Sequence, residues 1–104
     1  MIAFTALADP TRRQIVEMLA EGERTAGDIA KQFDVSAPAI SQHLKVLRQA
    51  RLVRVRAEAQ RRIYTLDAEG IGEIDAWLGE IRRFWSQRLD ALEHELRKSE
   101  GETQ

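Results

Sequence analysis

The feature that most constrains how this chain can fold is a change in the spacing of its apolar residues. Up to about Arg51 they recur at steps of three and four, as on one face of an α-helix. From Leu52 to Arg56 they alternate with arginines, and Ile63 to Leu66 is rich in strand formers. The helical spacing returns after Asp67. The sequence therefore predicts a mainly α fold with a small β-hairpin (α+β).

Helix start signals divide the N-terminal half of the chain. Asp9 followed by Pro10 is a side-chain cap before a first-turn proline, and it predicts a helix to about Ala20. Gly22 is expected to end that helix in a left-handed conformation. Ahead of it, the apolar residues between Ile2 and Leu7 indicate a short packing helix.

Two more helices are expected within residues 25–50. Thr25, with Asp28 three positions on, matches the capping-box pattern and starts a short helix. After a turn of about three or four residues, Ser36 caps a helix that runs to about Arg48. A polar face on the second helix of such a pair is typical of a helix-turn-helix. The buried side of this second helix is expected to carry Ile40, Leu44 and Leu47.

Residues 52–66 are expected to form a two-stranded ribbon with a basic tip, which carries Arg61 and Arg62. The tip sequence Glu58-Ala59-Gln60 contains no glycine, so a tight two-residue turn is not expected. A basic ribbon directly after a helix-turn-helix is typical of a winged helix. We therefore expect a winged helix-turn-helix.

Charge is unevenly distributed along the chain. Residues 36–66 carry seven Lys or Arg against one acid, whereas the chain as a whole has a net charge of -1. A basic segment in an otherwise acidic chain favours an anionic partner such as nucleic acid. The alternative, a solvated basic face balanced by the acidic C-terminal part, stays open on charge alone.

Composition excludes several classes of protein. The chain has 104 residues, 43% of them hydrophobic, which suits one domain over residues 1–104 and argues against disorder. It contains no cysteine, so disulfides and zinc-thiolate sites are excluded. The sequence has no basic leader and no run of about eighteen apolar residues, so a cytoplasmic location is expected. No cofactor is expected.

A long helix is expected from about residue 68 to residue 98, followed by a polar tail. Gly70, Gly72 and Gly79 each disfavour it by about 1 kcal/mol, so packing must compensate. Its apolar stripe is too wide and too aromatic for solvent, which predicts a partner helix and makes it the dimerisation helix. The alternative is that the stripe packs on its own domain. The stripe comprises Ile71, Ile74, Trp77, Leu78, Ile81, Phe84, Trp85, Leu89 and Leu92.

The outward face of the helix from Ser36 to Arg48 has the composition of a DNA-reading surface. Near its start, Ala37 and Pro38 suit contact with a thymine methyl, and Ser41 and Gln42 suit hydrogen bonds with base edges. A two-fold dimer would set two such helices about 34 Å apart, one turn of DNA. The cations farther along, Lys45 and Arg48, are expected at phosphates.

Three runs carry a family resemblance: Leu7 to Arg13, Ser36 to Leu47, and Arg61 to Leu66. Together they resemble the ArsR family of winged-helix repressors, over about residues 4–66, and are closest to its branch without cysteine metal sites. The resemblance implies a homodimer that binds a partly palindromic operator upstream of its own operon and blocks transcription. It also implies that the first helix, with Phe4 and Leu7, joins the last helix in the dimer interface.

The resemblance further implies which residues contact DNA. The thiol motif of metal-sensing members has no counterpart, because Thr25-Ala26-Gly27-Asp28 contains no cysteine. The recognition positions of the family fall on Ser36, Ala37, Pro38, Ser41, Gln42, His43 and Lys45, and its wing positions on Arg61 and Arg62.

Other functions stay open at this point. A winged helix without specific DNA binding would be a protein-interaction module that uses its last helix. A metal-responsive repressor would use Asp90 and His94, one helical turn apart, across a dimer interface. An enzyme is not expected, because Ser41 and His43 point about 200° apart on a helix and cannot form a nucleophile-base pair.

Overall fold

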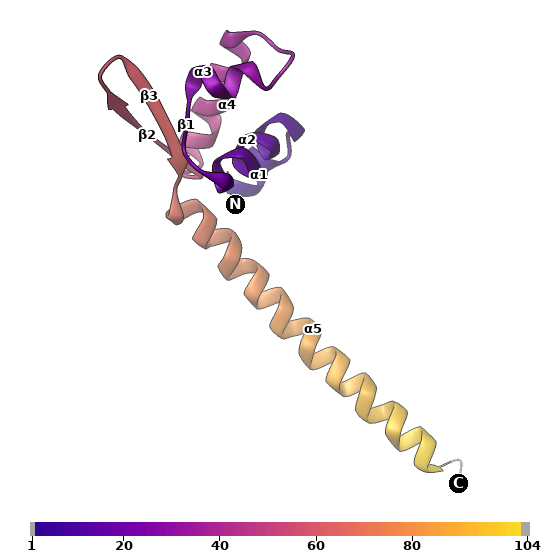
Figure 1. Cartoon of the computed structure of the whole chain (residues 1–104). Coiled ribbons are helices and arrows are strands. Elements are labelled where there is room, and N and C mark those ends of the chain that lie inside the picture. The colour runs from indigo at the N-terminus through magenta and orange to yellow at the C-terminus, as the bar shows by residue number, and fades with distance from the viewer. Residues whose placement is uncertain (1, 103–104) are drawn as a thin grey trace. The chain divides into compact units, whose positions relative to one another are not determined.

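The computed structural model describes residues 2–102, in which four helices precede the β-hairpin along the chain and one long helix follows it (Figure 1). The chain divides into two units, one up to Ile74 and one from Asp75 onward. We call the first the body. The elements are α1 (Ile2–Leu7), α2 (Pro10–Glu21), β1 (Arg24–Thr25), α3 (Ala26–Lys31), α4 (Ala37–Gln49), β2 (Val53–Glu58), β3 (Arg61–Leu66) and α5 (Ala68–Glu102).

The predicted helix caps are confirmed. The Arg12 N–H donates to Asp9 Oδ1 at 3.1 Å, and Thr25 and Asp28 form both hydrogen bonds of a capping box. Gly22 does end α2, with its N–H donating to the Leu19 carbonyl at 3.2 Å. The expected left-handed helical conformation is not formed, because ψ of Gly22 is 168°. Its φ of 153° is nevertheless positive, a backbone conformation that favours glycine.

Residues 32–36 connect α3 to α4, a longer connection than predicted. The extra length does not disturb the core, which forms where α2, α3 and α4 meet the sheet. α1 buries its small residues Ala3 and Ala6 fully and Leu7 partly, while Phe4 stays 37% exposed. The buried core includes the predicted Ile40, Leu44 and Leu47 together with Ile15, Leu19, Ile29, Leu52, Val53 and Tyr64.

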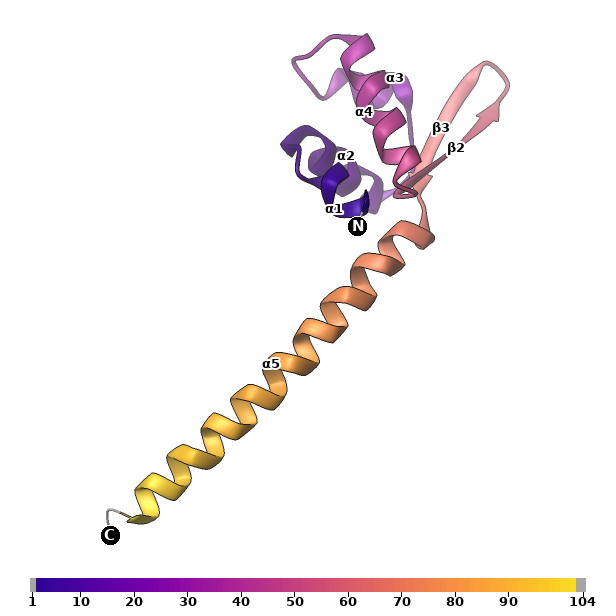
Figure 2. The ribbon, with the colours of Figure 1, turned by 180° about the vertical axis from the view of Figure 1, so that it is seen from behind.

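The sheet has three antiparallel strands in the order β1-β3-β2, and the β2–β3 hairpin extends away from the helices (Figures 1 and 2). β1 was not predicted, because two residues are too few to show a strand pattern. Glu58 pairs with Arg61, so the turn has two residues and the expectation of a longer turn is wrong. Six cross-strand residue pairs connect β2 and β3 along their whole length. In this tight turn Ala59 adopts a left-handed φ of 57°. For a residue other than glycine this backbone conformation costs about 1 kcal/mol.

α4 ends in a Schellman motif at the start of the hairpin. The Arg51 N–H donates to the Arg48 carbonyl and the Leu52 N–H to the Leu47 carbonyl, both at 3.0 Å. Arg51 takes the left-handed φ of 58° that this motif needs. Its carbonyl then accepts the Gly70 N–H at 2.8 Å. A Cβ on Gly70 would lie 2.4 Å from that carbonyl oxygen, so only glycine lets α5 pass so close.

α5 is one continuous helix to Glu102, so the expected polar tail is wrong for residues 98–102 (Figure 1). Residues 103 and 104 lie outside the described part of the chain. Ile71 and Ile74 are half-buried against the core of the body. Arg51 adds an ion pair with Glu69 at 2.6 Å. Within residues 2–102, no helix has the length and apolarity that crossing a membrane requires.

Candidate nucleic-acid interface

The outward face of α4 carries the residues that the sequence assigned to base reading. Ser36 fixes the first turn, because its Oγ accepts the Ala39 N–H at 3.3 Å. Ile40, Leu44 and Leu47 hold the opposite side in the core. Sequence reasoning missed Gln49, although it follows Gln42 by two helical turns. The exposed residues are Ser36, Ala37, Pro38, Ser41, Gln42, Lys45, Arg48 and Gln49.

His43 does not lie on this face, although the family resemblance grouped it with the recognition residues. It is half-buried, and its Nδ1 lies 3.3 Å from Nη1 of Arg12 on α2. A helix turns by about 100° per residue, so His43 points roughly 160° away from Ser41. The structure therefore brings His43 to a neighbouring helix and not to the exposed reading face.

Ion pairs divide the seven cations of residues 36–66 into two groups. Nη1 and Nη2 of Arg56 donate to the two carboxylate oxygens of Glu23, at 2.7 and 3.0 Å. This bidentate ion pair holds the pKa of Glu23 below its ordinary value. Glu58 also approaches Arg56 at 3.3 Å and Arg61 at 4.0 Å. Arg51 is paired as described above. Within residues 2–102, the structure records no ion pair for Lys45, Arg48, Arg54 and Arg62.

The two wing arginines face opposite sides of the hairpin. Successive residues of a strand alternate between faces, and Arg61 is opposite Glu58 while Arg62 is opposite Ala57. Arg61 is 4.0 Å from Glu58, and no ion pair is recorded for Arg62 within residues 2–102. Arg54 is a further exposed cation of the ribbon, which its alternation with Val53 and Val55 indicates in the sequence.

The stripe on α5 is exposed from Trp77 onward. Exposed fractions run from 36% at Ile81 to 64% at Leu96. Arg88 lies over the Phe84 ring, 5.6 Å from its centroid. Ile71 and Ile74, at the start of the stripe, are half-buried against the core of the body, and so is Leu7 of α1.

This arrangement is suited to recognition of a polyanion with an ordered surface. A rigid helix presents hydroxyl and amide groups beside two free cations, and a basic ribbon extends from the same body.

Residues 9–55 match the family described as bacterial regulatory protein, arsR family. The chain is also 46% identical over 100 residues to the HTH-type transcriptional regulator Rv2034 of Mycobacterium tuberculosis, covering 96% of this chain and 90% of that protein. The chain belongs to the arsR family.

Two further comparisons link arsR-family proteins to this fold and to regulation. The transcriptional repressor SdpR of Bacillus subtilis is 40% identical over 75 residues, which cover 72% of this chain and 83% of that one. The solution structure of Mb0332 from Mycobacterium bovis, described as a homodimeric winged helix-turn-helix DNA-binding domain, superposes with a TM-score of 0.65. That match has 29% identity and covers 79% of this chain and 76% of that one. The fold of this arsR-family regulator is thus the expected winged helix-turn-helix.

No metal-sensing site is recorded in the described part of this arsR-family chain. The chain has no cysteine. Among residues 2–102, no group of three or more His, Asp or Glu residues is placed to hold a metal ion. Asp90 and His94 lie on α5 without a third ligand from the same chain.

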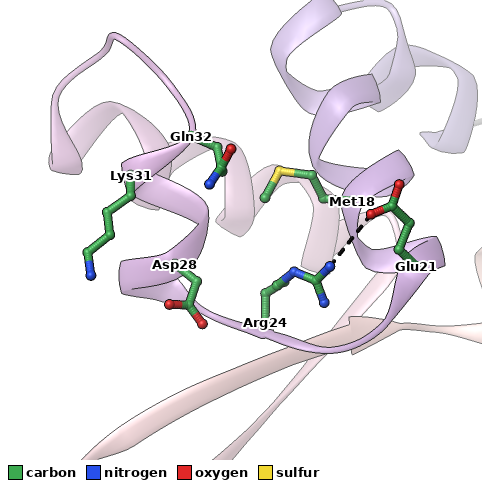
Figure 3. A pocket seen from close by; sticks show the side chains of 6 residues that line it. All are labelled: Met18, Glu21, Arg24, Asp28, Lys31 and Gln32. Atoms are coloured by element: carbon green, nitrogen blue, oxygen red, sulfur yellow. Dashed lines mark ion pairs between the residues drawn. The ribbon is translucent and has the colours of Figure 1, made fainter.

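A hollow of about 380 Å³ opens beside α2, β1 and α3 (Figure 3). Arg24 pairs with Glu21 across it at 3.6 Å. Asp28 is held by the hydroxyl and N–H of Thr25, which keep the pKa of Asp28 below its ordinary value. Both acids therefore already have partners, and the charges around the hollow are mixed. Its lining is Met18, Glu21, Arg24, Asp28, Lys31 and Gln32.

Proposed function

We propose that this protein is a homodimeric repressor that binds an inverted repeat in double-stranded DNA upstream of its own operon. The observation that carries the proposal is the exposed face of α4, which combines base-reading groups with free cations. Membership of the arsR family and the likeness to a homodimeric DNA-binding domain support it. A regulator acts where its DNA lies, so we expect the protein in the cytoplasm and assign it no catalytic role.

Sequence reading is assigned to the N-terminal half of α4. Ser41 and Gln42 bring short polar groups to base edges, and a glutamine amide can form two hydrogen bonds with adenine. Ala37 and Pro38 offer small apolar surfaces that suit a thymine methyl. Ser36 supports this set as the helix cap and lies at the edge of the face.

Binding of the DNA backbone is assigned to cations for which the described residues, 2–102, provide no recorded ion pair. On α4 these are Lys45 and Arg48, and on the ribbon they are Arg54 and Arg62. Arg61 would have to break its contact with Glu58 to bind a phosphate, so it is a weaker candidate for a phosphate contact than Arg62. Each phosphate contact releases a counterion, so this part of the affinity depends on salt but not on sequence.

The dimer interface is assigned to the α5 stripe from Trp77 onward, with Phe4 on α1. The stripe repeats every eleven residues: Leu78 and Leu89, Ile81 and Leu92, and Trp85 and Leu96. Eleven residues make three turns at 3.67 residues each, close to the 3.6 of a straight helix. The stripe therefore stays on one face and is suited to a second, nearly straight helix. We infer that a second copy of α5 covers it.

Charges on α5 favour an antiparallel pair. Residues 82–88 carry three arginines and no acid, whereas residues 90–95 carry three acids. Parallel helices in register would set each block against its own copy. Antiparallel helices centred near Leu89 would set the basic block against the acidic one. An antiparallel, two-fold pair also fits a two-fold inverted repeat.

The test begins with footprinting of the region upstream of the operon. Fluorescence anisotropy then compares the protected duplex with a scrambled duplex of equal composition. Gln42→Ala is expected to raise Kd for the protected duplex by about a hundredfold or more, because one bidentate base contact is lost in each half-site. Binding of the scrambled duplex is expected to stay unchanged. Gln14→Ala, at an exposed position of α2, is the matched control and keeps wild-type affinity for both.

Arg62→Ala separates grip from reading in the same assay. It is expected to weaken both duplexes equally and to lower the magnitude of the slope of log K against log salt by about two, because each of the two copies loses one phosphate contact. Absence of any protected repeat at low salt would contradict the proposed function. Equal loss on both duplexes with Gln42→Ala would reassign that side chain to the DNA backbone.

A further inference from the structure

Arg12 is the residue at which three helices of the body meet. Its backbone N–H donates to the Asp9 cap of α2 at 3.1 Å. Its Nε–H donates to the Ala6 carbonyl at the end of α1, at 2.5 Å. Its Nη1 lies 3.3 Å from Nδ1 of His43 on α4. One half-buried guanidinium thus connects α1 to the back of the recognition helix.

The chemistry of this contact fixes the state of His43. A guanidinium carries only donors, so Nδ1 of His43 has to accept. Acceptance requires a neutral imidazole with its proton on Nε2. A proton on Nδ1 would remove the acceptor and set a second positive charge beside Arg12. The contact therefore exists only with neutral His43.

The charged groups recorded around this pair come from α2 and its cap. The Asp9 carboxylate accepts the Arg12 N–H, and this bond holds the pKa of Asp9 below its ordinary value. Asp9 attracts a protonated His43, which offsets part of the repulsion by Arg12. It cannot replace the lost acceptor. α1 contains no charged residue, and Ile40 and Leu47 beside His43 on α4 are buried and apolar.

We propose that Arg12 and His43 are positioning residues that seat the recognition helix only while His43 is neutral. The preference for the protected duplex should therefore fall when acid protonates His43. The inference rests on the proposed DNA-binding function. It predicts an effect opposite in sign to simple electrostatics, by which an added cation strengthens DNA binding.

The first test needs no DNA. Long-range ¹H–¹⁵N correlation spectra of the full chain at about pH 8 report which ring nitrogen of each histidine carries the proton. His43 is expected as the Nε2–H tautomer, and this signature is expected to weaken in Arg12→Met. The Nδ1–H tautomer or a charged ring at this pH would overturn the inference.

The second test measures Kd for the protected and the scrambled duplex between about pH 5.5 and 7.5 at constant ionic strength. The preference is measured as Kd for the scrambled duplex divided by Kd for the protected duplex. This ratio is expected to fall about fivefold toward low pH, the equivalent of one hydrogen bond. His43→Gln is expected to keep the preference at both pH values, because its amide oxygen can accept from Arg12 and does not titrate. The chain has two histidines, so His94→Gln is the matched control and keeps the wild-type pH dependence.

The outcomes distinguish this inference from the function on which it rests. Lack of preference for the protected duplex at pH 7.5 overturns the proposed function. A wild-type preference that stays constant or rises toward pH 5.5 overturns only the role of His43. The same holds if His43→Gln keeps the pH dependence or His94→Gln removes it. Circular dichroism at both pH values checks that the helices persist in every variant.

Discussion

The body and the C-terminal part of α5 use their apolar residues in opposite ways. In the body, side chains such as Ile15, Leu44 and Leu52 are almost fully buried within one chain. Between residues 75 and 101, every residue except Gly79 is exposed, including the two tryptophans. Most apolar burial in the body is achieved in one copy, whereas we propose that a second copy buries the α5 stripe. Burial of the core should therefore not depend on protein concentration, and burial of the stripe should.

The largest effect that sharpens this contrast comes from removing one leucine in each region. Leu44→Ala is expected to lower the free energy of unfolding by about 3 kcal/mol, because Leu44 is only 2% exposed and a cavity remains. Leu92 is 54% exposed, so Leu92→Ala should leave the fold of the monomer intact and raise the dimer dissociation constant. Urea unfolding at two protein concentrations, with sedimentation equilibrium, measures both.

The contrast fails if the two leucines behave alike. A concentration-independent loss of stability with Leu92→Ala would mean that α5 is covered by its own chain. A wild-type protein that sediments as a monomer at about 10 μM would remove the second copy from the account. Gln87→Ala, an exposed polar position on the same helix, is the matched control for helix propensity.

A smaller effect tests the point where α5 leaves the body. Gly70→Ala is expected to destabilise the fold by about 2 kcal/mol, since the added Cβ would lie 2.4 Å from the Arg51 carbonyl oxygen. Gly72→Ala, two residues on, has no atom within 4 Å of its added Cβ and is expected to stabilise by about 0.5–1 kcal/mol. Thermal unfolding of both variants should show midpoints on opposite sides of the wild type. Equal shifts would mean that the close approach at Gly70 is not maintained.

These two glycines also show where sequence reasoning succeeds and where it stops. Signals that act within a few residues predicted the caps at Asp9, Thr25 and Ser36 and the buried side of α4. The cost of glycine in a helix is equally visible at Gly70 and Gly72. Only the structure shows that Gly70 is needed, because the atom it must avoid belongs to Arg51, which is remote in sequence.

The candidate site follows the same division. Helical spacing was enough to predict the exposed face of α4, from Ala37 to Arg48. It could not distinguish Arg62 from Arg61, because the difference is a partner across the hairpin turn. The contact of His43 spans 31 residues and the ion pair of Arg56 spans 33. The tight turn at Ala59 was missed because strand pairing outweighs a local preference for glycine.

The smallest effect concerns the surface charges of the body. Arg56 holds the pKa of Glu23 below the ordinary glutamate value of about 4.3. Because the pKa of Glu23 is lowered in the folded state, the ion pair stabilises the fold at every pH above the ordinary glutamate pKa. This contribution is lost as the pH falls through the lowered pKa. Arg56→Gln should therefore reduce the melting temperature at pH 7, and its difference from the wild type should shrink toward pH 3.

The matched control is Arg54→Gln on the same face of β2, because Arg54 has no recorded ion pair within residues 2–102. Its difference from the wild type should stay small and nearly constant with pH. The side chains of Arg56 and Glu23 are about half exposed, so solvent screens the pair and about 0.5 M salt should also narrow the Arg56→Gln difference. A difference that stays constant down to pH 3 would mean that Glu23 does not depend on Arg56.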